Sequence, residues 1–379
     1  MISVEAVPRV TPSRESRPLR VLMVSTRAFP YTGGVETHIH EVAPRLVRMG
    51  ASITLATTDP GHRYSRKEWV DGVQVRRLAA WPGKADFSLA PGIYRTIVTG
   101  QWDAVHCQGY HTLVPPVAML AAWRARIPYL VTLHSGGHSS RVRGAVRRIQ
   151  WQALRPLLAH AARLIAVSRF EAAFFAQRLG FQPDRFAVIP NGSDLPRAGV
   201  APRPSRRAPL ILSVGRLERY KGHHRVVEAM PEVLRQVPSA RLRIVGAGPY
   251  EPALRRRIEQ LGLVDRVEIA EVRASDRQGM ADLLSSAAAL VLLSDYESQS
   301  ITVMEALSVG CPVVASATSA LSEFADKGWI HAVAEPFTSA NVAAAILLQL
   351  RRPRSLASVD LPSWDDCAGA LMALYREVA

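Results

Sequence analysis

The sequence is poor in cysteine. Its 379 residues include only Cys107, Cys311 and Cys367, which lie far apart and form no CxxC pair. We therefore expect neither disulfides nor a structural zinc site, as is typical of a reducing compartment. Long apolar runs are also missing, because the longest, such as residues 114–122, fall short of the roughly 20 residues that a membrane-spanning helix needs. The first residues lack the pattern of a signal peptide, so we expect a soluble, cytoplasmic protein.

Acidic residues are scarce in the first half of the chain. Residues 1–196 hold 25 Lys and Arg against 12 Asp and Glu, a formal charge of +13, whereas residues 197–379 hold 22 against 20, a charge of +2. Arginines gather within residues 141–155 among apolar residues, which fits a basic amphipathic helix. Such a helix suits an anionic membrane or a phosphorylated partner, or it is only a solvated face. The residues expected in this patch are Arg141, Arg143, Arg147 and Arg148.

Aromatic residues are also few. They make up 7% of the chain, and no known nucleic-acid-binding motif occurs, so the basic charge does not lead us to expect a nucleic-acid partner. Apolar residues, in contrast, make up 48%, which in a chain of this length suffices for two domains, each with its own core.

Strand and helix patterns alternate along the chain and restart once. In the first half, a strand at residues 17–25, an amphipathic helix at 33–49 and a strand at 51–58 form a βαβ unit, in which Pro44 is expected to kink or break the helix. Further strands are expected at residues 73–78, 103–109, 128–134, 163–168 and 186–190.

The second half repeats the alternation after a stretch rich in Pro and Arg. Strands are expected at residues 210–217, 240–248, 266–270, 289–294 and 312–317, and helices at 223–237, 281–288 and 301–310. Such alternation predicts an α/β protein with two doubly wound, Rossmann-like domains and a ligand crevice between them. The expected divisions are a disordered arm (1–18), an N-terminal domain (19–195), a linker (196–208), a C-terminal domain (209–362) and a closing helix that returns to the N-terminal domain (363–379).

Two acids lie eight residues apart in a strand, polar loop, helix, strand stretch. A loop that enters a helix beyond the carboxyl end of a parallel strand suits phosphorylated ligands, and Glu297 and Glu305 can accept hydrogen bonds from sugar hydroxyls. A nucleotide-sugar site is therefore predicted. The alternative for Glu305 is a capping box with Thr302. We prefer a cap at Ser300, which places Glu305 inside the helix.

Cations and glycines mark other strand ends. Arg216 and Lys221 follow a strand and place two cations at the start of a helix whose N-terminal amides also favour an anion. Paired or spaced glycines in similar places let the backbone approach a phosphate or a base; they are Gly33, Gly34, Gly246 and Gly248.

Histidines were weighed as ligands and as structural residues. His134 ends a strand and is expected to face the crevice. His138 follows it, but two glycines intervene and no acidic partner is evident, so a metal site is not expected. The remaining pairs were assigned to the surface or to helix caps; they are His38 with His40 and His223 with His224.

Several motifs occur in a fixed order across nearly the whole chain: GGVETH, PNGSD, GRLERYKG, VGAGP, ESQSITVMEALSVGCPVVAS and a closing SW…LY helix. This set resembles the group 1 (family 4) retaining glycosyltransferases of the GT-B fold. The resemblance implies transfer of a sugar from a nucleotide diphosphate sugar to an acceptor, with retained anomeric configuration and with neither metal nor cofactor.

The resemblance also implies roles for single residues. Arg216 and Lys221 would grip the donor diphosphate, Glu297 and His134 the transferred sugar, and Glu305 the ribose. Glu36 would support the glycine loop or cap the helix rather than react. The N-terminal domain would bind the acceptor, and the C-terminal domain the nucleotide-sugar donor. The backbone amides of the loop would meet the sugar or phosphate; they belong to Gln299, Ser300 and Ile301. The family more often has a Phe-Gly pair where this chain has SQS, which leaves the donor sugar open.

The acceptor is less defined. The basic first half favours a lipid-linked or phosphorylated acceptor at the inner membrane face, with a small soluble natural product as the alternative. A sugar-nucleotide epimerase can share this architecture, but the N-terminal half offers no convincing paired catalytic acids and bases.

Overall fold

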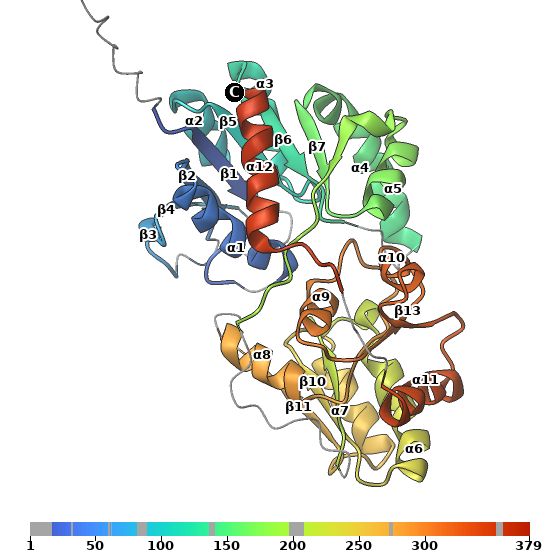
Figure 1. Ribbon diagram of the computed structural model, residues 1–379. Coiled ribbons are helices and arrows are strands. Elements are labelled where there is room, and N and C mark those ends of the chain that lie inside the picture. The colour runs from blue at the N-terminus through green and yellow to red at the C-terminus, as the bar shows by residue number, and fades with distance from the viewer. Residues whose placement is uncertain are drawn as a thin grey trace, which may run out of the picture.

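The computed structural model describes residues 17–31, 33–59, 61, 63–81, 89–135, 141–196, 208–272, 276–353 and 359–379, with the backbone alone at 141–147. Most of the expected arm, most of the expected linker and His138 lie outside these residues. Two sheets, each flanked by helices on both faces, form the upper and lower halves of Figure 1. The predicted α/β class with two Rossmann-like domains is confirmed.

The N-terminal sheet has the order β3-β4-β2-β1-β5-β6-β7-β8. Its strands are β1 (Arg20–Ser25), β2 (Ser52–Thr58), β3 (Lys67–Val70), β4 (Val73–Leu78), β5 (Ala104–Gln108), β6 (Tyr129–Thr132), β7 (Arg163–Ala166) and β8 (Phe186–Val188). Neighbours pair in parallel except β3, which runs antiparallel to β4 at the edge. The seven parallel strands were predicted, whereas β3 was not, because its four residues carry no apolar alternation.

Helices cover both faces of this sheet. They are α1 (Gly34–Arg48), α2 (Pro91–Thr99), α3 (Val114–Ala125), α4 (Arg141–His160) and α5 (Arg169–Leu179), with a short η1 (Pro183–Arg185) before β8. Side chains alternate along β1, so that Leu22 packs towards α2 and α3 while Val21 and Met23 pack towards α1. Of the two expectations at Pro44, the break is wrong, because α1 continues through it with buried residues on either side held against the sheet, while the kink stays a prediction.

The C-terminal sheet has the order β11-β10-β9-β12-β13-β14, and all its pairs are parallel. Its strands are β9 (Leu210–Val214), β10 (Arg241–Val245), β11 (Val267–Ala270), β12 (Ala289–Leu292), β13 (Val313–Ser316) and β14 (His331–Val333). Its helices are η2 (Arg219–Lys221), α6 (His223–Gln236), α7 (Glu251–Gln260), α8 (Arg277–Ser286), α9 (Ile301–Ser308), α10 (Leu321–Asp326) and α11 (Ser339–Arg351). The sequence did not predict β14, α7, α10 or α11.

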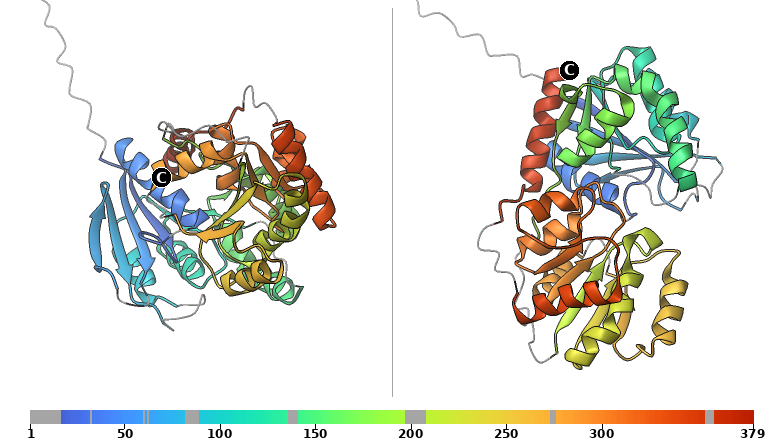
Figure 2. Two further views of the ribbon diagram at one scale, coloured as in Figure 1. Left: turned by 90° about the horizontal axis from the view of Figure 1, so that it is seen from below. Right: turned by 90° about the vertical axis from the view of Figure 1, so that its right-hand side faces the viewer.

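The chain passes between the domains twice, and the two passages touch. The backbone amide and hydroxyl of Ser193 both donate to the carbonyl oxygen of Pro362, each at 3.1 Å. After the second passage, α12 (Trp364–Val378) packs against α1, as Figures 1 and 2 show. The backbone amide of Trp364 donates to the Asp194 carboxylate at 2.6 Å. These contacts tie the chain's last helix to the end of the N-terminal domain.

Candidate functional site

The Glu297 carboxylate lies beyond the carboxyl end of β12 and is held by several groups. Lys221 Nζ and Ser294 Oγ both donate to Glu297 Oε1 at 2.7 Å. The Glu297 backbone amide donates to Ser319 Oγ at 2.7 Å. The side chain is almost fully buried. Hydrogen bonds at both the backbone amide and the carboxylate of Glu297 therefore fix the position of its side chain.

Lys221 reaches Glu297 because of the glycine that follows it. Gly222 has a left-handed φ of 74°, and a Cβ there would lie 2.0 Å from the carbonyl oxygen of Leu293. Only glycine lets η2 lie this close to the end of β12. The cation and the acid, 76 residues apart in sequence, thereby form a direct ion pair.

Arg216 lies in the same neighbourhood but points more towards solvent. Its guanidinium pairs with Glu218, and its side chain is 55% exposed. Tyr220 lies close enough to both Arg216 and Glu297 for their charges to affect it. Burial raises the pKa of the Tyr220 hydroxyl, and the carboxylates of Glu297 and Glu218 raise it further, whereas Arg216 lowers it. The Tyr220 ring stacks on Tyr296 with centroids 4.8 Å apart. Arg216, Lys221 and Glu297 thus share one end of the C-terminal sheet.

Glu305 has a different partner. As preferred from the sequence, α9 begins at Ile301 and Ser300 caps it, its hydroxyl accepting from the Val303 amide; the capping box at Thr302 is wrong. Glu305 is buried inside α9 and accepts from Arg277 Nη1 at 2.7 Å. Burial raises the pKa of its carboxyl group, and Arg277 opposes the rise. Within the described residues its ion pair is with Arg277, not with Arg216 or Lys221.

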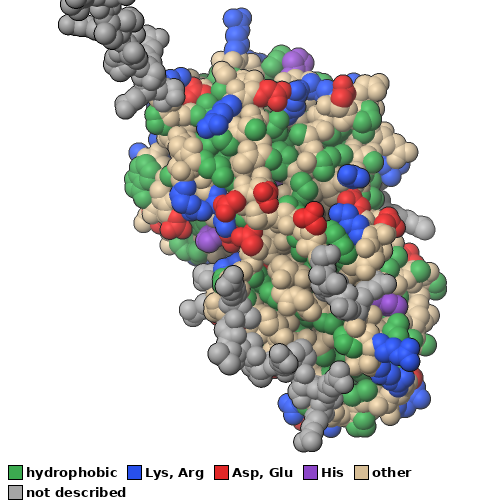
Figure 3. Space-filling view, in the orientation of Figure 1, with side chains coloured by type: hydrophobic (Ala, Val, Ile, Leu, Met, Phe, Trp, Pro, Cys, Tyr) green, Lys and Arg blue, Asp and Glu red, His purple; other side chains and the backbone are tan. Residues whose placement is uncertain are grey.

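Arg277 also links the two domains. Its Nε lies 3.4 Å from Glu41 Oε1 on α1, and Glu41 pairs in turn with Arg45 at 2.6 Å. Figure 3 shows acidic and basic side chains gathered at mid-height, where the domains meet. The link from Arg277 to Glu41 was not predictable from the sequence, because the two residues come from helices in different domains.

The glycine loop at the start of α1 faces Arg216. The Glu36 carboxylate accepts from its own backbone amide; burial raises its pKa, while Arg216 and Arg27 lower it. A Cβ on Gly33 would lie 2.3 Å from Glu36 Oε2, whereas Gly34 has open space. The Glu36 carboxylate therefore lies against Gly33, and its role in supporting the loop stays a prediction.

Gly246 and Gly248 are explained by loop packing. A Cβ on Gly246, whose φ is 149°, would lie 2.0 Å from the carbonyl oxygen of Gly215, and one on Gly248 would lie 2.4 Å from that of Leu217. These glycines bring the loop after β10 against the loop that carries Arg216. Their contact with a donor stays a prediction.

His134 lies just beyond β6 with a left-handed φ of 51°. Its Nε2 is hydrogen-bonded to Gln108 Oε1 at 2.8 Å, and its ring meets that of His38 edge to face at 4.9 Å. Burial, and then the nearby histidines His38, His106 and His111, hold its pKa well below the usual value. The ring is therefore neutral near pH 7.

Two histidines assigned to the surface or to caps are core residues instead. His38 is buried, and its Nδ1 is hydrogen-bonded to Asn191 Oδ1 at 2.8 Å. His223 is buried between Ser213 Oγ, at 2.8 Å, and the Arg216 carbonyl, at 3.3 Å. Burial lowers the pKa of each to about 4. His38 is the fifth residue of α1 and His223 the first of α6, and the N-caps of these helices are Gly33 and Gly222, so both histidines pack inward rather than cap.

The SQS loop contributes contacts between the domains that the sequence did not predict. Gln299 Oε1 accepts from the Asn191 backbone amide at 2.7 Å, and Ile301 packs against the N-terminal core. A second bond runs from the Phe170 amide to Glu323 Oε1 at 2.7 Å. The PNGSD motif was the one sequence signal for the Asn191 region.

Glu171 was also missed. It is fully buried, and its carboxylate accepts from the backbone amides of Ser135, at 2.5 Å, and Val167, at 2.8 Å. Burial raises its pKa to about 8, and the two amide donors oppose the rise. Because Ser135 follows His134, Glu171 holds the segment that carries this histidine.

The arginine segment forms the helix α4, as expected, but only part of its apolar side is free. Trp151 is buried and donates through Nε1 to the Tyr110 hydroxyl at 3.0 Å, and Leu154 is also buried. Arg148 and Ile149 are exposed, and Ile149 is 73% exposed. The side chains of Arg141, Arg143 and Arg147 lie outside the described residues.

The expectations about cysteines, membrane-spanning helices and metal ligands can be compared with the described residues only. The three cysteines are free and buried. Over these residues no helix is both long and apolar enough to cross a membrane. The same part of the chain contains no group of three or more His, Cys, Asp or Glu side chains arranged to hold a metal ion.

Two family models match the chain. The one described as Glycosyltransferase Family 4 matches residues 32–197, and the one described as Glycosyl transferases group 1 matches residues 201–359. Their border falls between the two sheets, and together they span most of the chain.

Individual proteins are similar over nearly their full length. The glycogen synthase of Mycobacterium tuberculosis (strain CDC 1551 / Oshkosh) is 29% identical over 371 residues, which cover 88% of this chain and 87% of that protein. The D-inositol 3-phosphate glycosyltransferase of Rhodococcus opacus (strain B4) is 26% identical, with 97% and 92% covered. Among solved structures, HepE of Anabaena in complex with UDP-glucose has a TM-score of 0.69 at 20% identity, with 95% and 97% covered.

Proposed function

The chain belongs to the group 1 (family 4) glycosyltransferases, which act on nucleotide sugars, and from this premise we propose that it transfers the sugar with retained anomeric configuration and without a bound metal. The observation that carries the proposal is the contact between Lys221 and Glu297 at 2.7 Å, beside Arg216. A cation and a buried acid held side by side suit a donor with an anionic diphosphate and a hydroxylated sugar.

Arg216 and Lys221 would act on the leaving group. As the bond between sugar and diphosphate breaks, negative charge grows on the diphosphate, and cations already fixed there stabilise the transition state more than the ground state. Arg216 is half-exposed and free to turn towards a ligand. Lys221 is held by Glu297, so its charge is in place before the donor arrives.

Glu297 and His134 would position the transferred sugar. Both Oε1 contacts of Glu297 come from donors, so its carboxylate can accept further bonds from hydroxyls through Oε2. We assign it no covalent role: retention would proceed by substitution on one face, with the leaving phosphate assisting the acceptor proton. His134 is neutral, so it can donate or accept a hydrogen bond without adding charge.

Glu305 would bind the ribose hydroxyls from inside α9. Arg277 occupies its carboxylate through one oxygen, at 2.7 Å. A ribose would therefore meet an acid whose orientation is already set by an arginine.

The donor can be identified by measuring which nucleotide sugar raises the melting temperature of the protein. A ligand that binds only the folded state raises the apparent melting temperature. We would compare UDP, GDP and ADP sugars, beginning with UDP-glucose because the Anabaena protein is complexed with it. One nucleotide class should stabilise the native protein and leave Lys221→Ala unshifted. If no class stabilises the native protein, the proposal fails.

Labelled donor separates transfer from epimerisation. A transferase releases nucleoside diphosphate and passes label to an added acceptor, whereas an epimerase yields an isomerised nucleotide sugar with no acceptor present. An isomerised sugar nucleotide would contradict the proposal.

For the acceptor we propose a phosphorylated or lipid-linked molecule, held by the basic N-terminal half at the inner membrane face. The charge of +13 in residues 1–196 supports this choice. So does the relative from Rhodococcus opacus, which is named for a phosphorylated acceptor. A small soluble acceptor is the second candidate. Binding to anionic vesicles should weaken as salt rises; absent or salt-insensitive binding would favour the soluble acceptor.

A further inference from the structure

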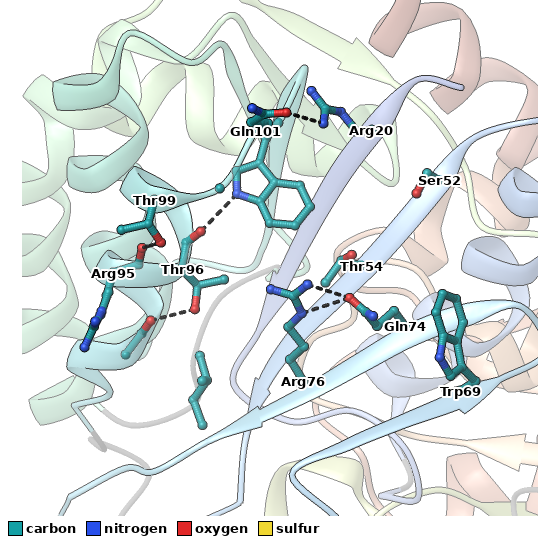
Figure 4. A pocket seen from close by; sticks show the side chains of 14 residues that line it. Arg20, Ser52, Thr54, Trp69, Gln74, Arg76, Arg95, Thr96, Thr99 and Gln101 are labelled. Atoms are coloured by element: carbon teal, nitrogen blue, oxygen red, sulfur yellow. Dashed lines mark hydrogen bonds between the residues drawn. The ribbon is translucent and has the colours of Figure 1, made fainter. Parts of the chain in front are cut away.

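One face of the N-terminal sheet is polar where a helix would be expected to cover it. Along β4, Val73 and Val75 are buried on one face, whereas Gln74 and Arg76 lie on the other. On the face of Gln74 and Arg76, α2 packs over Leu22 and Val24 of β1 and Ala56 of β2, but it does not cover the residues of β4 and β3, as Figure 4 shows. Parallel strands are ordinarily apolar on both faces, whereas an antiparallel edge can leave one face to solvent. The polar residues at this edge are therefore open to a ligand.

A hollow of about 700 Å³ lies between this open face and α2. That volume is typical of sites for small ligands. Its lining residues are Arg20, Ser52, Thr54, Trp69, Gln74, Arg76, Leu78, Gly92, Arg95, Thr96, Thr99, Gly100, Gln101 and Trp102. None of them belongs to the crevice around Glu297, and none of these described residues is acidic.

The arginines of the hollow carry uncompensated charge. Arg76 donates to the neutral amide oxygen of Gln74 at 2.6 and 2.9 Å, and Arg20 Nη1 donates to that of Gln101 at 2.8 Å. Arg20 Nε is buried with no partner among the described groups. Within the same part of the chain, Arg95 has neither a hydrogen-bond nor an ion-pair partner for its side chain.

Nearby acids do not neutralise this charge. Asp103 accepts from the Arg20 backbone amide and pairs with Arg17 at 2.6 Å, outside the hollow. Across the β3–β4 ladder, Arg76 faces another cation, Lys67. Like charges opposite each other destabilise a sheet unless something offsets them. An anionic ligand would supply that offset.

Aromatic and amide groups surround the arginines. The Arg76 guanidinium lies 5.8 Å from the centre of the Trp102 ring, and Trp102 Nε1 is fixed to the Thr96 carbonyl at 3.0 Å. Trp69 on β3 lies opposite Gln74 on β4, and its indole, at the rim of the hollow, is 70% exposed. Exposed rings can stack on sugar rings, and the amides and hydroxyls suit their hydroxyl groups.

We propose that this hollow is a second binding site for an anionic sugar, a sugar ring that carries a phosphate or a carboxylate. The guanidinium groups of Arg76 and Arg20 would donate paired hydrogen bonds to the anion, and the indole of Trp69 would stack on the sugar ring. A bare anion would leave the aromatic rim unused, and a neutral sugar would leave the arginines unpaired. The site is separate from the transfer crevice, so it serves to hold a sugar rather than to react with it.

Calorimetric titration of the full chain with four probes tests the proposal: glucose 6-phosphate, trigalacturonate, glucose and inorganic phosphate. At least one of the two anionic sugars should bind, and more tightly than glucose or phosphate. If glucose 6-phosphate alone binds, the source is a free sugar phosphate; if trigalacturonate binds better, it is the end of an acidic saccharide. Arg76→Ala should weaken binding about tenfold, the loss expected for a charge-assisted hydrogen bond, and Trp69→Ala should also weaken it.

Control variants test whether the anionic sugar binds at the hollow rather than elsewhere. Arg124→Ala removes an exposed cation from α3 and should change nothing. Lys221→Ala should also keep the binding, which separates this site from the crevice, and Arg76→Ala should keep donor turnover. The proposal is overturned if Arg76→Ala binds as the native protein does, if phosphate binds as tightly as both sugars, if a single-stranded oligonucleotide binds the site and the sugars do not, or if nothing binds.

Discussion

At the crevice, single atoms decide where the charges lie. Lys221 meets Glu297 because Gly222 has no Cβ, and Glu297 keeps its orientation because Ser294 and Ser319 hold opposite ends of the residue. The sequence predicted the cation and the acid. It did not predict the serines, because serine is common at strand ends and nothing local marks these two.

Gly222→Ala tests this close approach. The added Cβ would overlap the Leu293 carbonyl and take a left-handed φ, so we expect a loss of about 2 kcal/mol or more in unfolding free energy. Gly262→Ala is the control, because its φ of 64° is also left-handed but the space around it is open, and it should cost about 1 kcal/mol. Urea denaturation measures both. Equal losses would show that η2 does not need the glycine.

Burial of His38 should make the free energy of unfolding depend on pH. Burial lowers the pKa of His38 from 6.5 to about 4, so the unfolded chain binds a proton there before the folded chain does. Its contribution is complete above pH 6.5 and is lost as pH falls towards 4. We expect His38→Gln to reduce the decrease in unfolding free energy between pH 7 and pH 5, measured by urea denaturation. His40→Gln, an exposed change on the same helix, should not.

At the scale of elements, strands with apolar runs were predictable, including the edge strands β8 and β11, whereas the edge strands β3 and β14 were not. Parallel strands such as β1, buried on both faces, read as continuous apolar runs. β3 carries Lys, Glu and Trp at an edge, where pairing with β4 decides its conformation. Pro44 shows the limit of a local signal, since packing keeps α1 unbroken across it.

Ser300→Ala tests which residue starts α9. The hydroxyl of Ser300 satisfies the Val303 amide, so its loss should cost about 1 kcal/mol in unfolding free energy. Thr302→Ala, already inside the helix, should cost less. Denaturation curves that ranked the two variants the other way would restore the capping box at Thr302.

At the scale of the whole molecule, the two domains meet through residues that no local pattern connects. Gln299 and Asn191 are 108 residues apart, and Arg277 reaches Glu41 from a different domain. The motif order was enough to predict two Rossmann-like domains and to indicate that Lys221 and Glu297 lie together. It did not predict that Glu305 would pair with Arg277, because that depends on how α8 and α9 pack.

The most direct measurement is donor turnover in EDTA, with the nucleotide sugar that stabilises the protein most, for the native chain and for Lys221→Ala. Fixed cations that stabilise the leaving diphosphate predict full native turnover without metal and a loss of about 100-fold in the variant, the effect of removing one preorganised donor. Native turnover that requires added Mg²⁺, or a variant as fast as the native chain, would contradict the proposed role of Lys221 beside Glu297.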